Sequence, residues 1–116
     1  MRKTIIIGCL EETLDTIRCL ISMNFTIDGV VTLPENQASQ ISNWVDISSF
    51  CVQHKIPCHY VENYSMKTEA DCELIRNLDP EAIYVVGWQR LIPVNIIKTV
   101  TADIIGFHGS ANLLPW

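Results

Sequence analysis

The residues best suited to chemistry lie in segment 106–116, whose sequence is GFHGSANLLPW. His108 directly follows an apolar run, with Gly106 two residues before it and Ser110 in the turn after it. A histidine can give or take a proton near neutral pH, because its ordinary pKa is about 6.5. At the end of a strand it is well placed for general acid or base catalysis, although a structural role fits the same position.

A second candidate loop is GWQRLIP, at residues 87–93, which follows the clearest strand pattern of the chain. It can be an ordinary strand-to-helix connection in which Trp88 covers the core. It can also offer main-chain polar groups and an apolar wall to a flat heterocycle. Taken alone, the loop leaves both interpretations open.

A compact set of two cysteines and two histidines raises the question of zinc. Its members are Cys51, His54, Cys58 and His59. The first two fall on a predicted helix, while strand alternation points the last two to opposite faces, so a shared tetrahedral site is disfavoured. We expect buried thiols, a surface histidine and no metal.

Gly8 ends the first apolar run and could begin a phosphate-binding loop. A dinucleotide site needs further glycines there, but Cys-Leu-Glu-Glu follows, and Glu11 and Glu12 would repel a phosphate. A receiver-type magnesium site would need acidic residues at the end of the first strand, where Cys9 and Leu10 stand. We expect Gly8 to serve a tight turn.

Composition narrows the class of protein. The chain has 116 residues and a formal charge of −5, and its eight Lys and Arg are scattered. This disfavours nucleic acid as a partner and favours a small-molecule substrate. No apolar stretch approaches the roughly 20 residues that span a bilayer, and five cysteines suit a reducing compartment. We expect a cytoplasmic protein without membrane attachment.

Strand and helix patterns alternate along the chain. Strands are predicted at 4–9, 27–33, 56–61, 82–86 and 102–108, and helices at 11–25, 44–55, 67–78 and 94–98. Residues 34–43 read as a polar connection. The apolar helix faces are expected to carry Leu14, Ile17, Leu20 and Ile21; Trp44, Ile47 and Val52; and Ala70, Leu74, Ile75 and Leu78.

This alternation predicts an α/β fold with a doubly wound parallel sheet, in one domain over residues 1–116. Ligands of such sheets bind at the carboxyl ends of the strands. Both candidate loops, and Gly8 as well, are predicted to lie at that edge.

Together the two loops resemble the formyltransferases that use 10-formyltetrahydrofolate, which act on methionyl-tRNA, glycinamide ribonucleotide or sugar amines, and the related hydrolases. The hallmark is a strand ending in Asn-x-His, then a Ser-containing turn and Leu-Leu-Pro. It is matched in order by His108, Ser110, Leu113, Leu114 and Pro115. The resemblance covers the whole chain and corresponds to the N-terminal part of the family's Rossmann-like catalytic domain, so the fold is expected to be truncated.

The resemblance implies roles for particular residues. The catalytic positions are His108, Gly106 and Ser110, and the positions lining the pterin pocket are Gly87, Trp88, Gln89, Arg90, Leu91 and Ile92. The co-substrate is 10-formyltetrahydrofolate, and no metal takes part. Gly106 replaces the family's usual Asn, and the family's catalytic Asp lies beyond residue 116, so the chain by itself is expected to be inactive.

The resemblance says less about the acceptor amine. The phosphate-binding glycine loop of the glycinamide ribonucleotide enzymes has no match at residues 8–12. An amino sugar nucleotide is therefore our first choice. The alternatives are methionyl-tRNA as acceptor, or a non-catalytic module that binds a pterin or nucleotide. A homo-oligomer is expected as well, because the last strand would leave an uncovered edge.

Overall fold

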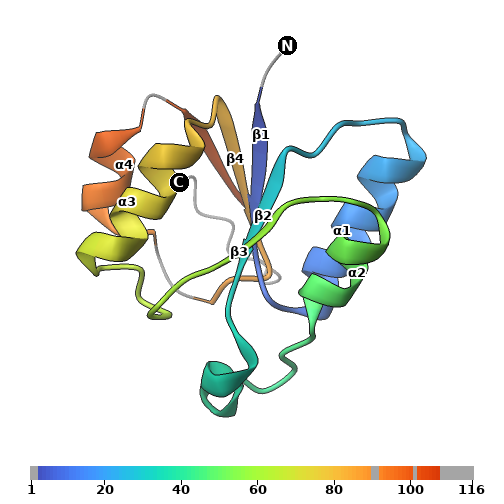
Figure 1. Ribbon diagram of the computed structural model, residues 1–116, viewed down its shortest axis with the longest axis horizontal. Helices are drawn as coiled ribbons and strands as arrows, with labels where there is room; N and C mark the ends of the chain where they lie inside the picture. Colours follow the sequence, from blue (N-terminus) through green and yellow to red (C-terminus); the bar gives the residue numbers. More distant parts are fainter. Residues whose placement is uncertain (1–2, 90–91, 101, 108–116) are drawn as a thin grey trace.

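The computed structural model describes residues 3–89, 92–100 and 102–107. Five parallel strands form one sheet in the order β3-β2-β1-β4-β5 (Figure 1). The strands are β1 (Thr4–Ile7), β2 (Gly29–Thr32), β3 (Cys58–Tyr60), β4 (Ala82–Val86) and β5 (Asp103–Phe107). The helices are α1 (Glu11–Ser22), α2 (Ile47–Gln53), α3 (Glu69–Leu78) and α4 (Val94–Thr99), with the 3₁₀ helix η1 (Glu35–Gln40).

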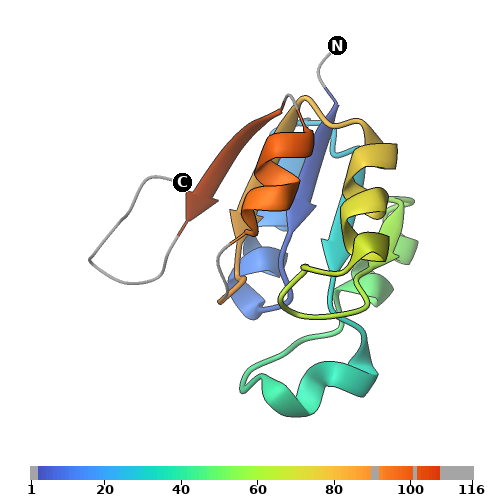
Figure 2. The same ribbon diagram turned by 90° about the vertical axis from the view of Figure 1, so that its left-hand side faces the viewer.

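Helices cover both faces of the sheet, and each face has its own core. Ile17 of α1 and Ile47 of α2 pack in one cluster, while Ile75 of α3 and Ile96 of α4 pack in the other. Figure 1 shows the two helix pairs on opposite sides of the strands, and in Figure 2 β5 lies at one edge. The predicted doubly wound parallel fold is confirmed.

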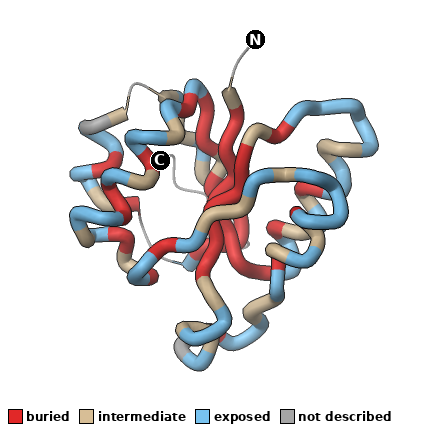
Figure 3. Tube along the Cα trace, viewed as in Figure 1, coloured by how far each residue is buried: buried red, intermediate tan, exposed pale blue. Residues whose placement is uncertain are grey.

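The central strand explains why the sheet is buried on both sides. Ile5 and Ile7 of β1 belong to the α3/α4 core, and Ile6 belongs to the α1/α2 core. Successive side chains of a strand point to opposite faces, so a continuous apolar run fills both layers. Figure 3 shows burial concentrated along the strands. Each such side chain contributes about 1.5–3 kcal/mol by leaving water.

Several predicted boundaries were wrong. The second helix begins at Ile47 rather than Trp44, because the Asp46 side chain accepts a hydrogen bond from the Ser48 N–H and caps it. Trp44 packs instead against the α3/α4 core. Residues 34–43, predicted as a plain connection, contain η1.

Two predicted helix faces were partly wrong as well. Val52 is 77% exposed, and its neighbour Cys51 faces the core. Ala70 is exposed, while Cys72 and Ile75 provide the buried face of α3. A short helix has few turns, so few residues define its buried face. Assigning that face from apolar residue types alone therefore shifted the predicted face by one residue.

Strand ends also differ from the prediction. β1 stops before Gly8, and β3 starts after Pro57. Pro57 has no N–H to donate, and its carbonyl accepts a hydrogen bond from the Val30 N–H.

Among the described residues, no helix is long and apolar enough to cross a bilayer.

Candidate functional site

The topology selects one region of the carboxyl edge. From β1 the chain winds outward through β2 and β3 and then returns to the other side of β1 with β4. Such a reversal leaves a crevice between the loops that follow the two inner strands, and ligands of open α/β sheets bind there. The loops in question start at Gly8 and Gly87, so the sheet brings together two of the segments singled out in the sequence.

The two loops meet around the side chain of Thr13, in the first turn of α1. Its hydroxyl donates to the Val86 carbonyl at 2.6 Å and accepts from the Leu10 N–H at 3.3 Å. A Cβ on Gly8 would lie 2.0 Å from the Val86 carbonyl oxygen, and one on Gly87 would lie 2.1 Å from the Thr13 hydroxyl oxygen. Gly87 also has φ +73°, which other residues rarely adopt. Both glycines are therefore required by close approach.

The loop after β1 is closed by hydrogen bonds within the protein. Gly8 N–H donates to the Val31 carbonyl, and Cys9 N–H donates to the Gly87 carbonyl, each at 3.0 Å. The Cys9 carbonyl accepts from the Val45 N–H at 3.0 Å, and segment 41–46 thus covers this end of the sheet. Trp44 completes the cover, because its indole N–H donates to the Leu33 carbonyl at 2.9 Å.

Cys9 is the one nucleophile-type side chain of this closed loop. Burial, and secondarily the negative charge of Glu12, raise the pKa of its thiol to about 12. The thiolate is the reactive form of cysteine, so Cys9 stays protonated at neutral pH and is unsuited to nucleophilic catalysis.

The loop after β4 differs, because it holds a polar group without a partner. Trp88 is 4% exposed, and its indole N–H finds no hydrogen-bond acceptor among the described residues. A buried, unsatisfied donor costs about 1–3 kcal/mol. Such a group is usually satisfied by water or a ligand, so it distinguishes the loop after β4 as the one that can still accept a polar partner.

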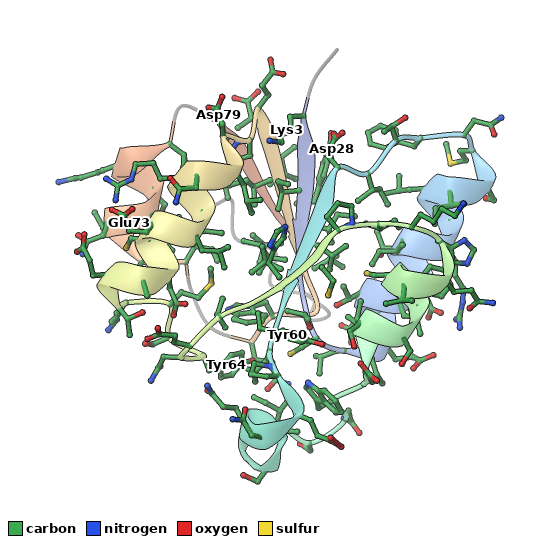
Figure 4. All side chains as sticks on the ribbon, in the orientation of Figure 1. Lys3, Asp28, Tyr60, Tyr64, Glu73 and Asp79 are labelled. Atoms are coloured by element: carbon green, nitrogen blue, oxygen red, sulfur yellow. The ribbon has the colours of Figure 1, made fainter. Side chains whose placement is uncertain are left out.

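Tyr64 holds this loop from the α3/α4 side. Its ring meets that of Trp88 edge to face, with ring centres 4.8 Å apart. Its hydroxyl oxygen accepts from the Gln89 N–H at 2.8 Å. Figure 4 shows Tyr64 at the carboxyl end of the strands, far from Lys3 and Asp28 at the opposite end. Ile92 is buried and belongs to the same core.

The structure brings together part of the predicted site. Gly87, Trp88, Gln89 and Ile92 lie at or near the carboxyl end of β4. Gly106 pairs with Val85 in the register of β4 and β5, one strand away. Arg90, Leu91, His108 and Ser110 lie outside the described residues, so their roles stay predictions.

The fold does not bring the four candidate zinc ligands, Cys51, His54, Cys58 and His59, together at one site. His54 stacks on Phe50 with ring centres 4.2 Å apart, and the His59 ring approaches Gly29, 3.8 Å from the position of an added Cβ. The thiols of Cys51 and Cys58 are hydrogen-bonded to each other. That bond and burial raise the pKa of Cys51, while the same bond lowers the pKa of Cys58. No group of three or more potential metal ligands occurs among the described residues.

Sequence reasoning missed Thr13 and Tyr64. Thr13 reads as an ordinary residue of an acidic first helical turn, and Tyr64 falls between a predicted strand and helix. The available signal for Thr13 was a small hydroxyl residue just after a strand that ends in glycine. Nothing local marks Tyr64, because its partners lie 24 and 25 positions along the chain.

Curated proteins of known activity are similar to this chain over nearly its whole length. The chain is 26% identical over 113 residues to the bifunctional polymyxin resistance protein ArnA of Wigglesworthia glossinidia brevipalpis, covering 97% of this chain and 17% of that protein. It is 26% identical to a methionyl-tRNA formyltransferase of Sulfurihydrogenibium sp., covering 97% of this chain and 36% of that one. The predicted resemblance to formyltransferases is confirmed. No protein-family profile matches.

Solved structures agree on the fold. Phosphoribosylglycinamide formyltransferase from Streptococcus pneumoniae superimposes with a TM-score of 0.66 at 12% identity, over 93% of this chain and 57% of that chain. Glycinamide ribonucleotide transformylase 1 from Symbiobacterium toebii gives 0.63 at 9% identity, over 91% and 50%. The chain thus spans about a third or less of the two curated relatives and about half of these structures.

Proposed function

We propose that residues 1–116 form a domain that is the N-terminal part of a folate-dependent N-formyltransferase, which moves a formyl group from 10-formyltetrahydrofolate to an amine. The observation that carries this proposal is the Trp88 loop. It lies at the switch point of the sheet and carries a buried indole N–H that no described residue pairs with, in a chain similar to formyltransferases.

The loop's chemistry fits a pterin. Trp88 and Ile92 are buried and form the apolar backing of the loop, and we assign the indole N–H as a donor to a nitrogen or oxygen acceptor of the ring. The Gln89 N–H is already used by Tyr64, so main-chain recognition has to come from other groups of Gly87, Trp88, Gln89, Arg90, Leu91 and Ile92. When bound, the co-substrate supplies an electrophilic formyl carbon. No metal is proposed.

The proposed chemistry places charge on both reactants. The attacking amine bonds to the formyl carbon and becomes cationic, while the formyl oxygen becomes anionic, so preorganised donors and a proton acceptor lower the barrier. The bond from that carbon to N10 of the folate then breaks, and the proton that the amine loses ends on N10. We assign proton transfer to His108 and a supporting hydroxyl to Ser110. Gly106 has no side chain and contributes only its backbone at the end of β5.

The closed loop after β1 helps to choose among the candidate acceptor amines. Its N–H groups at Gly8, Cys9 and Leu10 are all used internally, and exposed Glu11 and Glu12 stand beside it. A phosphate would find these three donors occupied, and two carboxylates in place of positive charge beside them. This supports an amino sugar nucleotide, bound elsewhere, over a glycinamide ribonucleotide.

Two alternatives have observations of their own. Four curated relatives are methionyl-tRNA formyltransferases, which keeps that acceptor open, although the charge of −5 makes nucleic acid an unlikely partner. Gly106 in place of a side-chain donor favours a non-catalytic pterin-binding module. We further propose a cytoplasmic protein and a homo-oligomer, since the exposed Ile105 lies on the edge strand β5.

The proposal is tested with 5-formyltetrahydrofolate, a stable reduced folate, by calorimetry. Trp88→Phe keeps an aromatic ring and removes the indole donor, and it should weaken binding about five- to tenfold. Trp44→Phe is the matched control, because its indole N–H is used by the Leu33 carbonyl. Absence of binding to the wild type, or equal losses in both variants, would overturn the proposal.

A further inference from the structure

The segment between β3 and α3 lies outside regular secondary structure, yet buried groups hold it in place. Asp71, in the first turn of α3, is 1% exposed. Its two carboxylate oxygens accept from the N–H groups of Glu62 at 2.7 Å and Asn63 at 3.1 Å. Hydrogen bonds to a charged acceptor are stronger than neutral ones, so this carboxylate fixes the backbone directly before Tyr64.

Helix α3 in turn holds Asp71 at a defined position. The Thr68 side chain caps the helix by accepting from the Asp71 N–H at 3.1 Å. Cys72, the next residue, packs in the α3/α4 core. The carboxylate is therefore attached to a rigid element on one side and to the loop on the other.

Tyr64 carries this constraint to the loop after β4. It is 4% exposed, and it contacts that loop in two ways, through the Trp88 ring and through the Gln89 N–H. Core packing alone would be satisfied by phenylalanine. The hydroxyl adds a directed acceptor that fixes the orientation of the Gln89 N–H.

We propose that Tyr64 and Asp71 are positioning residues that set the conformation of residues 87–89, in the loop after β4, for binding a reduced folate. This inference rests on the proposed function. The chain of contacts runs from Asp71 through the backbone at residues 62–63 to Tyr64, and from there to Trp88 and Gln89. The predicted site begins at Gly87, so this series of contacts extends the site onto α3.

The effect should fall on binding more than on the chemical step. Tyr64 contacts the loop proposed to hold the pterin, and Asp71 acts on that loop through the backbone at residues 62–63. In protein active in formyl transfer, Tyr64→Phe should raise KM for 10-formyltetrahydrofolate while kcat stays nearly constant. A purely structural role would instead lower the amount of folded protein and leave KM unchanged.

The test combines hydrogen exchange with folate binding. Tyr64→Phe keeps the ring and removes the acceptor, and the Gln89 amide should then exchange about tenfold faster. Affinity for 5-formyltetrahydrofolate should fall about five- to tenfold. Tyr60→Phe makes the same chemical change on a side chain that is 48% exposed, and it should alter neither quantity.

Two further variants separate effects on folding stability from effects on folate binding. Asp71→Asn should also weaken folate binding, at a cost in melting temperature, and Ile17→Val in the opposite core lowers melting temperature without touching the loop. Unchanged Gln89 exchange or unchanged affinity in Tyr64→Phe overturns the positioning role. Absence of folate binding by the wild type overturns the proposed function itself, and the inference with it, so the two failures are told apart by the wild-type titration.

Discussion

The loops after β1 and β4 begin alike and end differently. Each starts with a glycine pressed against Thr13, and they are joined by the hydrogen bond from Cys9 to Gly87. Beyond that point the β1 loop is covered by segment 41–46 and uses its polar groups internally. The β4 loop keeps a buried indole N–H that has no partner in the described part of the chain.

This difference teaches that the carboxyl edge is not uniformly available to ligands. A switch point supplies a crevice with two walls, and here one wall is completed by the protein itself. The ligand-binding capacity is therefore expected on the β4 and β5 side.

The largest effect is expected at His108, which follows β5. In protein active in formyl transfer, His108→Gln should lower kcat by about 10²–10⁴-fold, the usual loss for a positioned acid or base. His54→Gln is the control, since His54 stacks on Phe50 at the far face. Turnover is normalised to folded protein. Unaltered turnover in His108→Gln would remove this residue from the mechanism.

The next largest effects are expected at Gly8 and Gly87, the glycines with which the two loops begin. Gly8→Ala and Gly87→Ala should each lower the free energy of unfolding by about 3 kcal/mol or more, because a Cβ meets backbone or a fixed hydroxyl at close range. Gly29→Ala is the matched control, where the nearest contact is the end of the Ile5 side chain at 3.0 Å. Urea denaturation measures all three.

Thr13→Ala tests whether different atoms restrict the two glycine positions. Removing the hydroxyl should partly restore Gly87→Ala, whose Cβ clashes with that oxygen, and should restore Gly8→Ala much less, because the Val86 carbonyl remains in the way. Equal rescue of both glycine variants would show that the two loops do not differ in the way described.

The fold was largely predictable because β1 and β4 are nearly continuous apolar runs, at residues 4–7 and 82–86, and because β1 to β4 alternate with helices. The candidate site was predictable only in part. Gly87 and Trp88 were found from their place after a strand, whereas Tyr64 and Thr13 act through contacts between segments far apart in sequence. The α2 start was missed because the Asp46 cap outweighed the apolar pattern at Trp44.

The smallest expected effect concerns the closed loop and alkaline pH. The pKa of Cys9 is raised from 9.0 to about 12 in the folded state, so the folded protein holds this proton more tightly than the unfolded chain. The stability that this provides is complete below pH 9 and is lost as pH rises toward 12. Urea midpoints at increasing pH should therefore fall less steeply for Cys9→Ala than for the wild type.

Cys19→Ala is the control for that series, because Cys19 is exposed on α1. Its pH profile should follow the wild type. A Cys9→Ala profile that also follows the wild type would show that the β1 loop does not keep its thiol buried and protonated.

The central claim is that a reduced folate binds at the β4 loop and not at the β1 loop. The direct measurement is a titration of the ¹⁵N-labelled chain with 5-formyltetrahydrofolate, followed by amide chemical shifts. We predict saturable shifts within residues 87–92, including Gln89 and the indole N–H of Trp88, with residues 8–12 little changed. Shifts concentrated at residues 8–12, with the Trp88 indole signal unmoved, would contradict the account.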